Sequence, residues 1–226
     1  MTTQNLPGSE AARHGTGDAY LTIMLAAHEA LRRDLERLAR AAEFADLPDP
    51  GGHRSVRAGW ETFKRQLHLH HTAEDTIVWP ALRQRLSRSD DAQSVLHAME
   101  AEHQQIDPLL RAVDDAFARA GEGGRSDARA ISDVTDALTT ALASHLAHEE
   151  RDGLPLIGAA LTAAEWRRVG FKIARSNGLA AGEMFAWLAD GADPAQAAAV
   201  IGTLPPPARL AYRVIFKPRY ARTPRW

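Results

Sequence analysis

The chain has 226 residues, and 27 Lys and Arg against 29 Asp and Glu leave a net charge of −2 with histidine neutral. Its composition, 45% hydrophobic and 25% charged residues, is typical of a folded globular protein and excludes a collagen-like or wholly disordered chain. The near-neutral charge argues against nucleic acid as a partner. Cysteine is absent, which excludes disulfides, thiolate zinc sites and cysteine-held iron–sulfur clusters.

No targeting or membrane segment is predicted. The start, MTTQNLPGSE, has neither the basic region nor the apolar region of a signal peptide. No run of about 18 apolar residues occurs, so we expect no membrane span. These features, with the absence of cysteine, predict a cytoplasmic protein.

Four long amphipathic segments follow a polar lead-in, residues 1–17, which we expect to be flexible. Their apolar residues recur at steps of three and four, which is the pattern of one helix face. The breaks between them are expected at residues 46–52 and 121–127, Pro80 should end or kink the second helix, and Pro108 should bend the third. Strand-like alternation is missing. The sequence therefore predicts an all-α, up-down four-helix bundle over residues 18–160.

Residues 161–226 are predicted to form a small helical C-terminal extension. Thr162-x-x-Glu165 is a capping-box pattern that should start a helix, and Asn177-Gly178 should end it. Short helices are expected at about 180–190, 194–201 and 207–216. Residues 203–226 hold six basic side chains and no acidic one. They either stay solvated or pair within the chain, which we favour, or they dock an acidic protein partner or membrane surface.

An internal repeat with an offset of 75 residues relates the first two segments to the next two. The spacing between the paired histidines is the same in both halves, because 70 − 28 = 42 and 145 − 103 = 42. The second segment of each half also carries His-x-x-x-Glu, followed by a proline six residues later. The matched positions are Met24 and Met99, His28 and His103, His70 and His145, Glu74 and Glu149, and Pro80 and Pro155.

This pattern indicates a metal site in the bundle core. Residues i and i+4 stack on one helix face, so each His-x-x-x-Glu offers an imidazole and a carboxylate in one direction. Carboxylates buried without partners are very costly, and a pair of divalent ions would neutralise them. Imidazole with carboxylate suits iron, zinc and other transition ions. The candidate metal ligands are His28, His70, Glu74, His103, His145 and Glu149.

The segments LAAHEAL, LHLHHTAEDTIVWP, EAEHQQI and SHLAHEERDGLP make residues 18–160 resemble the hemerythrin-like, HHE cation-binding proteins. The resemblance implies a four-helix bundle with an oxo- or hydroxo-bridged di-iron centre held by the six candidates, zinc being the alternative metal. It implies binding of, or reaction with, dioxygen, nitric oxide or peroxide. The alternative is a metal-dependent sensor, an iron-binding module or a structural metal site without turnover, so catalysis is left open.

One position departs from the oxygen-carrying hemerythrins, which place a second histidine one turn after the third-helix histidine. Here Asp107 occupies it, followed by Pro108. Either the site gains an open position or Asp107 joins it, and both make peroxide or nitric oxide chemistry more plausible than reversible oxygen carriage. His68 is expected at the surface. His71 and His148 are either surface residues or groups that orient the ligands.

Overall fold

The computed structural model describes residues 18–43, 50–120 and 125–226. The predicted lead-in, residues 1–17, lies outside the described residues, as does much of both predicted breaks. Every regular element in these ranges is helical and none is a strand, so the predicted all-α class is confirmed. Within the same ranges, no helix combines the length and apolarity that crossing a bilayer requires.

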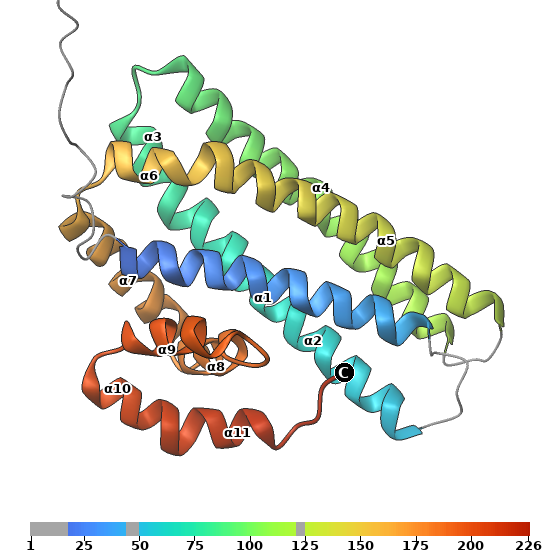
Figure 1. The fold of residues 1–226 in the computed structure, drawn as a ribbon. Coiled ribbons are helices and arrows are strands. Elements are labelled where there is room, and N and C mark those ends of the chain that lie inside the picture. The colour runs from blue at the N-terminus through green and yellow to red at the C-terminus, as the bar shows by residue number, and fades with distance from the viewer. Residues whose placement is uncertain (1–17, 44–49, 121–124) are drawn as a thin grey trace, which may run out of the picture.

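Four helical rods run alternately up and down (Figure 1). Contacts join α1 to α2, α1 to α5 and α4 to α5. The second and fourth rods each consist of a long helix, a π-helical turn and a short helix. The elements are α1 (Asp18–Glu43); α2 (Pro50–Ala73), η1 (Glu74–Val78) and α3 (Trp79–Arg85); α4 (Asp90–Ala120); and α5 (Arg125–His148), η2 (Glu149–Gly153) and α6 (Leu154–Ala160).

The second and fourth rods pass through their prolines instead of ending there. Pro80 and Pro155 occupy the first turn of α3 and α6, directly after η1 and η2. Proline cannot donate to the carbonyl four residues earlier, and its ring crowds that carbonyl. The wider π turn removes the conflict, because the residue before each proline bonds five residues back, to the carbonyl of Glu74 or Glu149. Of the two expectations for Pro80, that it ends its helix or kinks it, the first is not met, because the rod continues through η1 into α3. The helix α4 also continues past its proline, Pro108, which is exposed.

Two large apolar clusters fill most of the bundle, one toward each end, beside a small third cluster of Ala116 and Ile131. The first includes Leu31, Trp60, Phe63, Leu67 and Leu142, all at most 1% exposed. The second gathers side chains further along the rods in η1, α3 and α6 and near the start of α4; its largest members are Trp79, Leu82, Leu96, Met99 and Trp166. Along the second rod and along α4, the predicted ligand positions fall between the two clusters, so the core has a polar middle with apolar ends.

The C-terminal extension lies against α1 and α2, on the side away from α4 (Figure 1). Its elements are α7 (Ala163–Asn177), α8 (Ala180–Leu188), α9 (Pro194–Gly202), α10 (Pro206–Ala211), η3 (Tyr212–Phe216) and α11 (Lys217–Ala221). The predicted capping box of Thr162 and Glu165 is confirmed, and Gly178 ends α7 at φ 53°. Asp34 on α1 anchors the extension by accepting from the Trp187 indole N–H at 2.7 Å.

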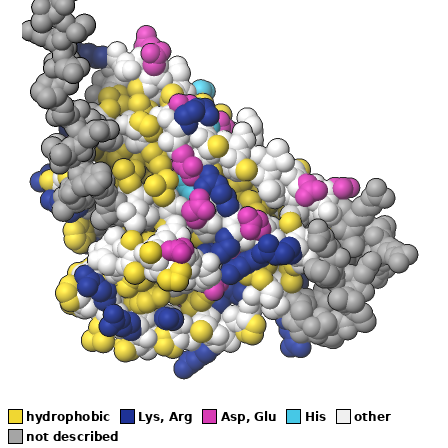
Figure 2. Space-filling model, in the orientation of Figure 1, with side chains coloured by type: hydrophobic (Ala, Val, Ile, Leu, Met, Phe, Trp, Pro, Cys, Tyr) yellow, Lys and Arg dark blue, Asp and Glu magenta, His cyan; other side chains and the backbone are white. Residues whose placement is uncertain are grey.

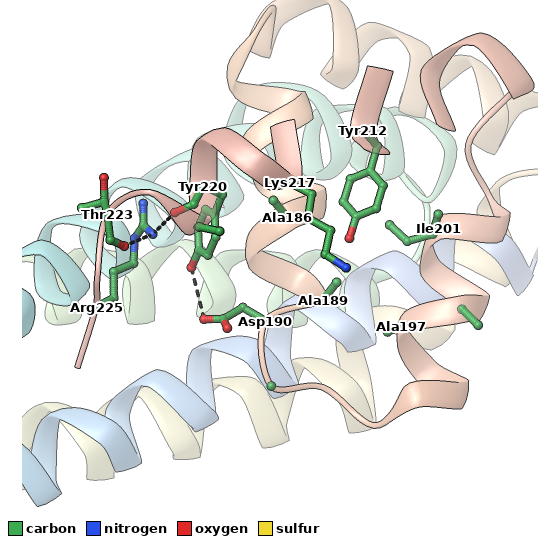
Figure 3. Close-up of a pocket in the computed structure, with 13 residues that line it drawn as sticks. Ala186, Ala189, Asp190, Ala197, Ile201, Tyr212, Lys217, Tyr220, Thr223 and Arg225 are labelled. Carbon is green, nitrogen blue, oxygen red and sulfur yellow. Dashed lines mark hydrogen bonds between the residues drawn. The ribbon is translucent and has the colours of Figure 1, made fainter. Parts of the chain in front are cut away.

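The basic tail contacts its own chain. Arg225 donates to the carbonyls of Tyr220 and Thr223 and, through Nε, to the Thr62 hydroxyl on α2 at 2.9 Å. The Tyr220 hydroxyl reaches Asp190 beside a cavity of about 540 Å³ within the extension (Figure 3). Among the described residues, the extension carries most of the exposed large apolar side chains. They are Phe171, Leu179, Leu210, Val214 and Ile215. Figure 2 shows hydrophobic side chains mixed with basic ones over the lower part of the molecule.

Candidate metal centre

The four rods bring the six predicted residues together in the middle of the bundle. His28 comes from α1, His70 from the end of α2, His103 from α4 and His145 from the end of α5. Glu74 and Glu149 are the first residues of the two π turns. Five of the six are at most 4% exposed, and the His70 side chain is the most accessible at 9%.

The potential ligands form two groups, in each of which one ligand atom per residue lies within 4.8 Å of the others. The first group holds two imidazoles and two carboxylates, and the second holds three imidazoles. The members are His28, His70, Glu74 and Glu149 in the first group, and His71, His103 and His145 in the second.

The two carboxylates lie between the groups. Glu74 places Oε1 3.2 Å from Nε2 of His70 and Oε2 3.6 Å from Nε2 of His103. Glu149 places Oε2 3.2 Å from Nε2 of His28 and 3.9 Å from Nε2 of His145. Each carboxylate therefore faces one imidazole of each group, which is the position that a bridging ligand occupies between two ions.

Several ligand atoms in this centre have no hydrogen-bond partner among the described residues. These buried atoms are Nε2 of His28, His70 and His71 and both carboxylate oxygens of Glu74 and Glu149. Buried polar atoms are almost always satisfied, so a cluster of unsatisfied ones needs an explanation. Metal ions satisfy nitrogen lone pairs and carboxylate oxygens together, whereas a hydrophobic core does not. The donor set thus fits transition-metal ions.

In the metal-free cluster, burial and neighbouring charges shift the pKa values of the two carboxyl groups in opposite directions. Burial raises the pKa of Glu74 well above its ordinary value, and the facing Glu149 raises it further. Burial also opposes the charge of Glu149, but the close contact with His28, at 3.2 Å, and its positive charge outweigh burial and lower the Glu149 pKa. Burial opposes charge on His28 too, yet Glu149 and Glu150 raise the His28 pKa to about 9.

Three other imidazoles of the cluster, those of His70, His71 and His145, have lowered pKa values and are neutral at pH 7. Burial, helped by the His28 charge, lowers the pKa of His70 to about 3. Burial followed by the nearby His103 lowers the pKa of His71 and of His145. Neutral imidazole is the form that binds a metal ion, so these groups are already in their ligand state.

Carboxylates outside the cluster hold the imidazoles by their other nitrogen. Nδ1 of His28 donates to Glu150 at 2.8 Å, and Nδ1 of His103 donates to Asp75 at 2.9 Å. Such contacts fix the tautomer and leave Nε2 free for the metal. Sequence reasoning missed both carboxylates, although Asp75 and Glu150 obey the same offset of 75 and each directly follows a candidate glutamate.

The second half of the repeat has a further carboxylate without a counterpart. Glu102 accepts from Nδ1 of His145 at 2.8 Å and from Nδ1 of His148 at 2.7 Å. The residue 75 positions earlier is Ala27. Of the two roles considered for His148, the structure favours the orienting one, because His148 shares the carboxylate that holds His145.

The sequence left the role of His71 open, and the structure brings its ring into a group of candidate ligands. The side chain is 8% exposed, and its ring stacks on His103 with centroids 3.8 Å apart. Its Nε2 has no partner and belongs to the three-imidazole group. Adjacent residues of a helix project about 100° apart. The centre lies between the directions of His70 and His71, so both rings reach the ligand groups.

The exposure or burial of four further side chains bears on the roles that the sequence left open for them. Asp107 and His68 are exposed. Asp107 belongs to neither ligand group found in the described part of the chain, so the suggestion that it joins the site is not supported. Met24 and Met99 pack in the apolar cluster with Val78 and Trp79.

Comparison with known proteins gives a family and a distant relative. The family model for the hemerythrin HHE cation-binding domain matches residues 20–157. The chain is 31% identical over 141 residues to the zinc finger protein BRUTUS of Arabidopsis thaliana. That alignment covers 61% of this chain and 10% of the plant protein, so the chain spans only a small part of this relative. No solved structure matches significantly.

Proposed function

The chain belongs to the hemerythrin HHE cation-binding family, and from this premise we propose that its bundle holds two iron ions and binds an uncharged small ligand: dioxygen, nitric oxide or peroxide. Cation binding follows from the family. The number of ions, their identity and the ligand are the proposal. The observation that carries it is that Glu74 and Glu149 each face an imidazole of both ligand groups.

The ligand set that we propose divides by group. His28 and His70 would hold one ion, His71, His103 and His145 would hold the other, and Glu74 and Glu149 would offer carboxylate oxygens to both. Two shared carboxylates compensate part of the charge of two divalent ions inside a core that would otherwise strongly disfavour charge. A single ion would leave one of the groups unsatisfied.

The unequal groups support a small-ligand role. The first ion would have two imidazoles and the second three, so the first has more room for an added ligand. The two apolar clusters limit the access of water to the centre. Bound iron would supply a redox-active Lewis acid at this position, and the chain's residues hold the imidazoles in their metal-binding tautomer.

The first test is metal content per chain with a visible spectrum, on protein purified without chelators and after anaerobic ferrous reconstitution. We expect about two irons per chain, as a two-ion site requires, with the absorbance of a bridged ferric pair. Two zinc ions and no stable iron would instead indicate a structural site. No metal in either preparation would refute the proposal.

A matched pair of variants on α2 tests the ligand assignment. His70→Ala removes a cluster imidazole, whereas His68→Ala removes an exposed one two residues earlier. We expect His70→Ala to lower the iron content and change the spectrum, and His68→Ala to leave both unchanged. Equal iron content in the two variants would exclude His70 as a ligand.

The ligand itself is tested on the reconstituted protein. Nitric oxide and dioxygen should each change the absorbance stoichiometrically, and peroxide should either be consumed repeatedly or react once. Repeated consumption indicates an enzyme, and a single stoichiometric reaction indicates a binding or sensing role. No response to any of the three would overturn the small-ligand part of the proposal.

A further inference from the structure

A small cavity joins the candidate centre to the C-terminal extension. Its volume is about 60 Å³, and its lining includes His70 and Glu74 of the first ligand group. No member of the three-imidazole group, His71, His103 or His145, lines it. His70 is also the most accessible member of its group. The cavity therefore reaches the centre from one side only.

The bundle and the extension each supply part of the wall. Side chains of α1 and α2, among them Ile23 and Leu69, line one part, and α7 and α8 supply Ile173, Asn177, Met184 and Trp187. Contacts of α7 with α1 and η1, and of α8 with α1, hold this cover in place (Figure 1). Without the extension, the cavity beside His70 would lose the part of its wall that α7 and α8 supply.

The lining is selective in both size and polarity. Room for one water needs roughly 10–15 Å³, so about 60 Å³ accepts a diatomic molecule or peroxide but not a chelator or a nucleotide. Most lining side chains are apolar, so an ion would lose its hydration without compensation. The cavity suits an uncharged molecule.

One polar group in the wall has an unused hydrogen bond. Gln66 is 3% exposed, and its amide nitrogen has no partner in the described part of the chain. It lies one helical turn before His70 and lines the same cavity. A buried donor without an acceptor is costly, and a small molecule with an oxygen acceptor in the cavity would satisfy it.

We propose that helices α7 and α8 make this cavity the selective passage and waiting site for the small ligand, with Met184 and Ile173 setting its width and Gln66 donating a hydrogen bond to its occupant. The proposal rests on the proposed function for the identity of the ligand. It also assigns a role to the extension, which lies beyond the residues that the family model matches: the extension covers the metal centre and filters what reaches it.

The cavity is tested first without metal, with xenon as the probe. Xenon binds in cavities with apolar walls, so xenon should shift the NMR signals of the Ile23 and Ile173 methyl groups in the metal-free protein. Met184→Trp should fill the cavity and abolish these shifts. Leu179→Trp is the matched control, because Leu179 is 79% exposed near the start of α8 and does not line the cavity.

The passage is then tested by the association rate of nitric oxide with the iron-loaded protein. Met184→Trp should slow association by about tenfold, as a blocked gating element does, and Leu179→Trp should leave the rate unchanged. Ile173→Ala widens the wall and should speed association, which keeps the test valid if the tryptophan variant fails to fold. Gln66→Leu should leave association unchanged and speed dissociation.

The outcomes separate this proposal from the proposed function. Xenon shifts with no metal binding would refute the di-iron function and leave the cavity established. Metal binding without xenon shifts would overturn the passage and leave the function standing. Unchanged nitric oxide association in both Met184→Trp and Ile173→Ala, with xenon displaced by the first, would show that the ligand enters elsewhere.

Discussion

Asp75→Asn should weaken metal binding although Asp75 contacts no metal-facing atom. Its Oδ1 accepts from Nδ1 of His103 at 2.9 Å, which turns Nε2 of that ring toward the cluster. Asparagine retains an acceptor oxygen but loses the charge that strengthens the bond, and its amide can also turn a donor toward the ring. The imidazole then loses both its fixed tautomer and part of its basicity.

The expected magnitude follows from the exposure of Asp75. Removing a carboxylate that holds a ligand histidine costs about 10–100-fold in metal affinity, which is roughly 1.4–2.8 kcal/mol. The Asp75 side chain is 36% exposed, so solvent screens part of the interaction. We therefore expect a loss of about tenfold, at the lower end of that range.

The assay is competition for zinc and, anaerobically, for ferrous iron against a chromophoric chelator. Zinc reports binding without redox chemistry, and circular dichroism checks the fold. Asp107→Asn is the matched control, since it removes an equal charge from an exposed position one turn after His103. Glu150→Gln repeats the test in the other half of the bundle, where Glu150 holds His28.

Two results would refute the reasoning. If Asp75→Asn binds metal within about twofold of the unsubstituted protein, Asp75 does not orient its histidine. If Asp75→Asn and Asp107→Asn lose affinity equally, the effect is one of overall charge and not of the hydrogen bond. A loss confined to Asp75→Asn and Glu150→Gln supports the paired arrangement.

Three further outcomes are expected. Asp34→Ala leaves the buried Trp187 indole N–H without an acceptor, so the unfolding free energy should fall by about 1–3 kcal/mol in urea denaturation; Asp34→Asn, which retains an oxygen, should lose less, and an equal loss would contradict this account. The hydrogen bond from the Thr162 backbone, followed by that from its side chain, lowers the pKa of Glu165 from 4.5 to about 2. The capping box therefore stabilises α7 fully at pH values above 4.5, and this stabilisation is lost as the pH falls through about 2. An NMR titration of Glu165 with its inflection near pH 4.5 would contradict this account. A methyl group at Gly182 would overlap the Phe216 ring, so Gly182→Ala should lower the unfolding free energy by about 1–3 kcal/mol, and an unchanged melting temperature would show that the ring moves aside.

The bundle and the repeated pairs were accessible from sequence because their information is local. His70 and Glu74 stack on one face by the helix period alone, and the same holds for His145 and Glu149. The offset of 75 then links the two halves without any knowledge of packing. Glycine, proline and the capping box mark most helix ends for the same reason, since a cap depends on a few neighbouring residues.

Proline shows where a local rule fails. Pro80 has the chemistry of a helix breaker, yet the rod continues because the π turn beginning at Glu74 absorbs the missing bond. That choice depends on packing at both ends of the rod, where Phe63 and Leu67 belong to one apolar cluster and Trp79 and Leu82 to the other. A window of a few residues cannot weigh those contacts.

The sequence by itself determined the helices, the repeat and the six candidate ligands, because these follow from spacing along the chain. Only the tertiary structure decided which neighbours reach the centre. Periodicity placed His71 with outward residues, but the direction in which α2 faces depends on the other three rods. Asp75, Glu102 and Glu150 hold their histidines across 28 or more positions. Contacts over such separations arise when helices pack, and no local pattern encodes them.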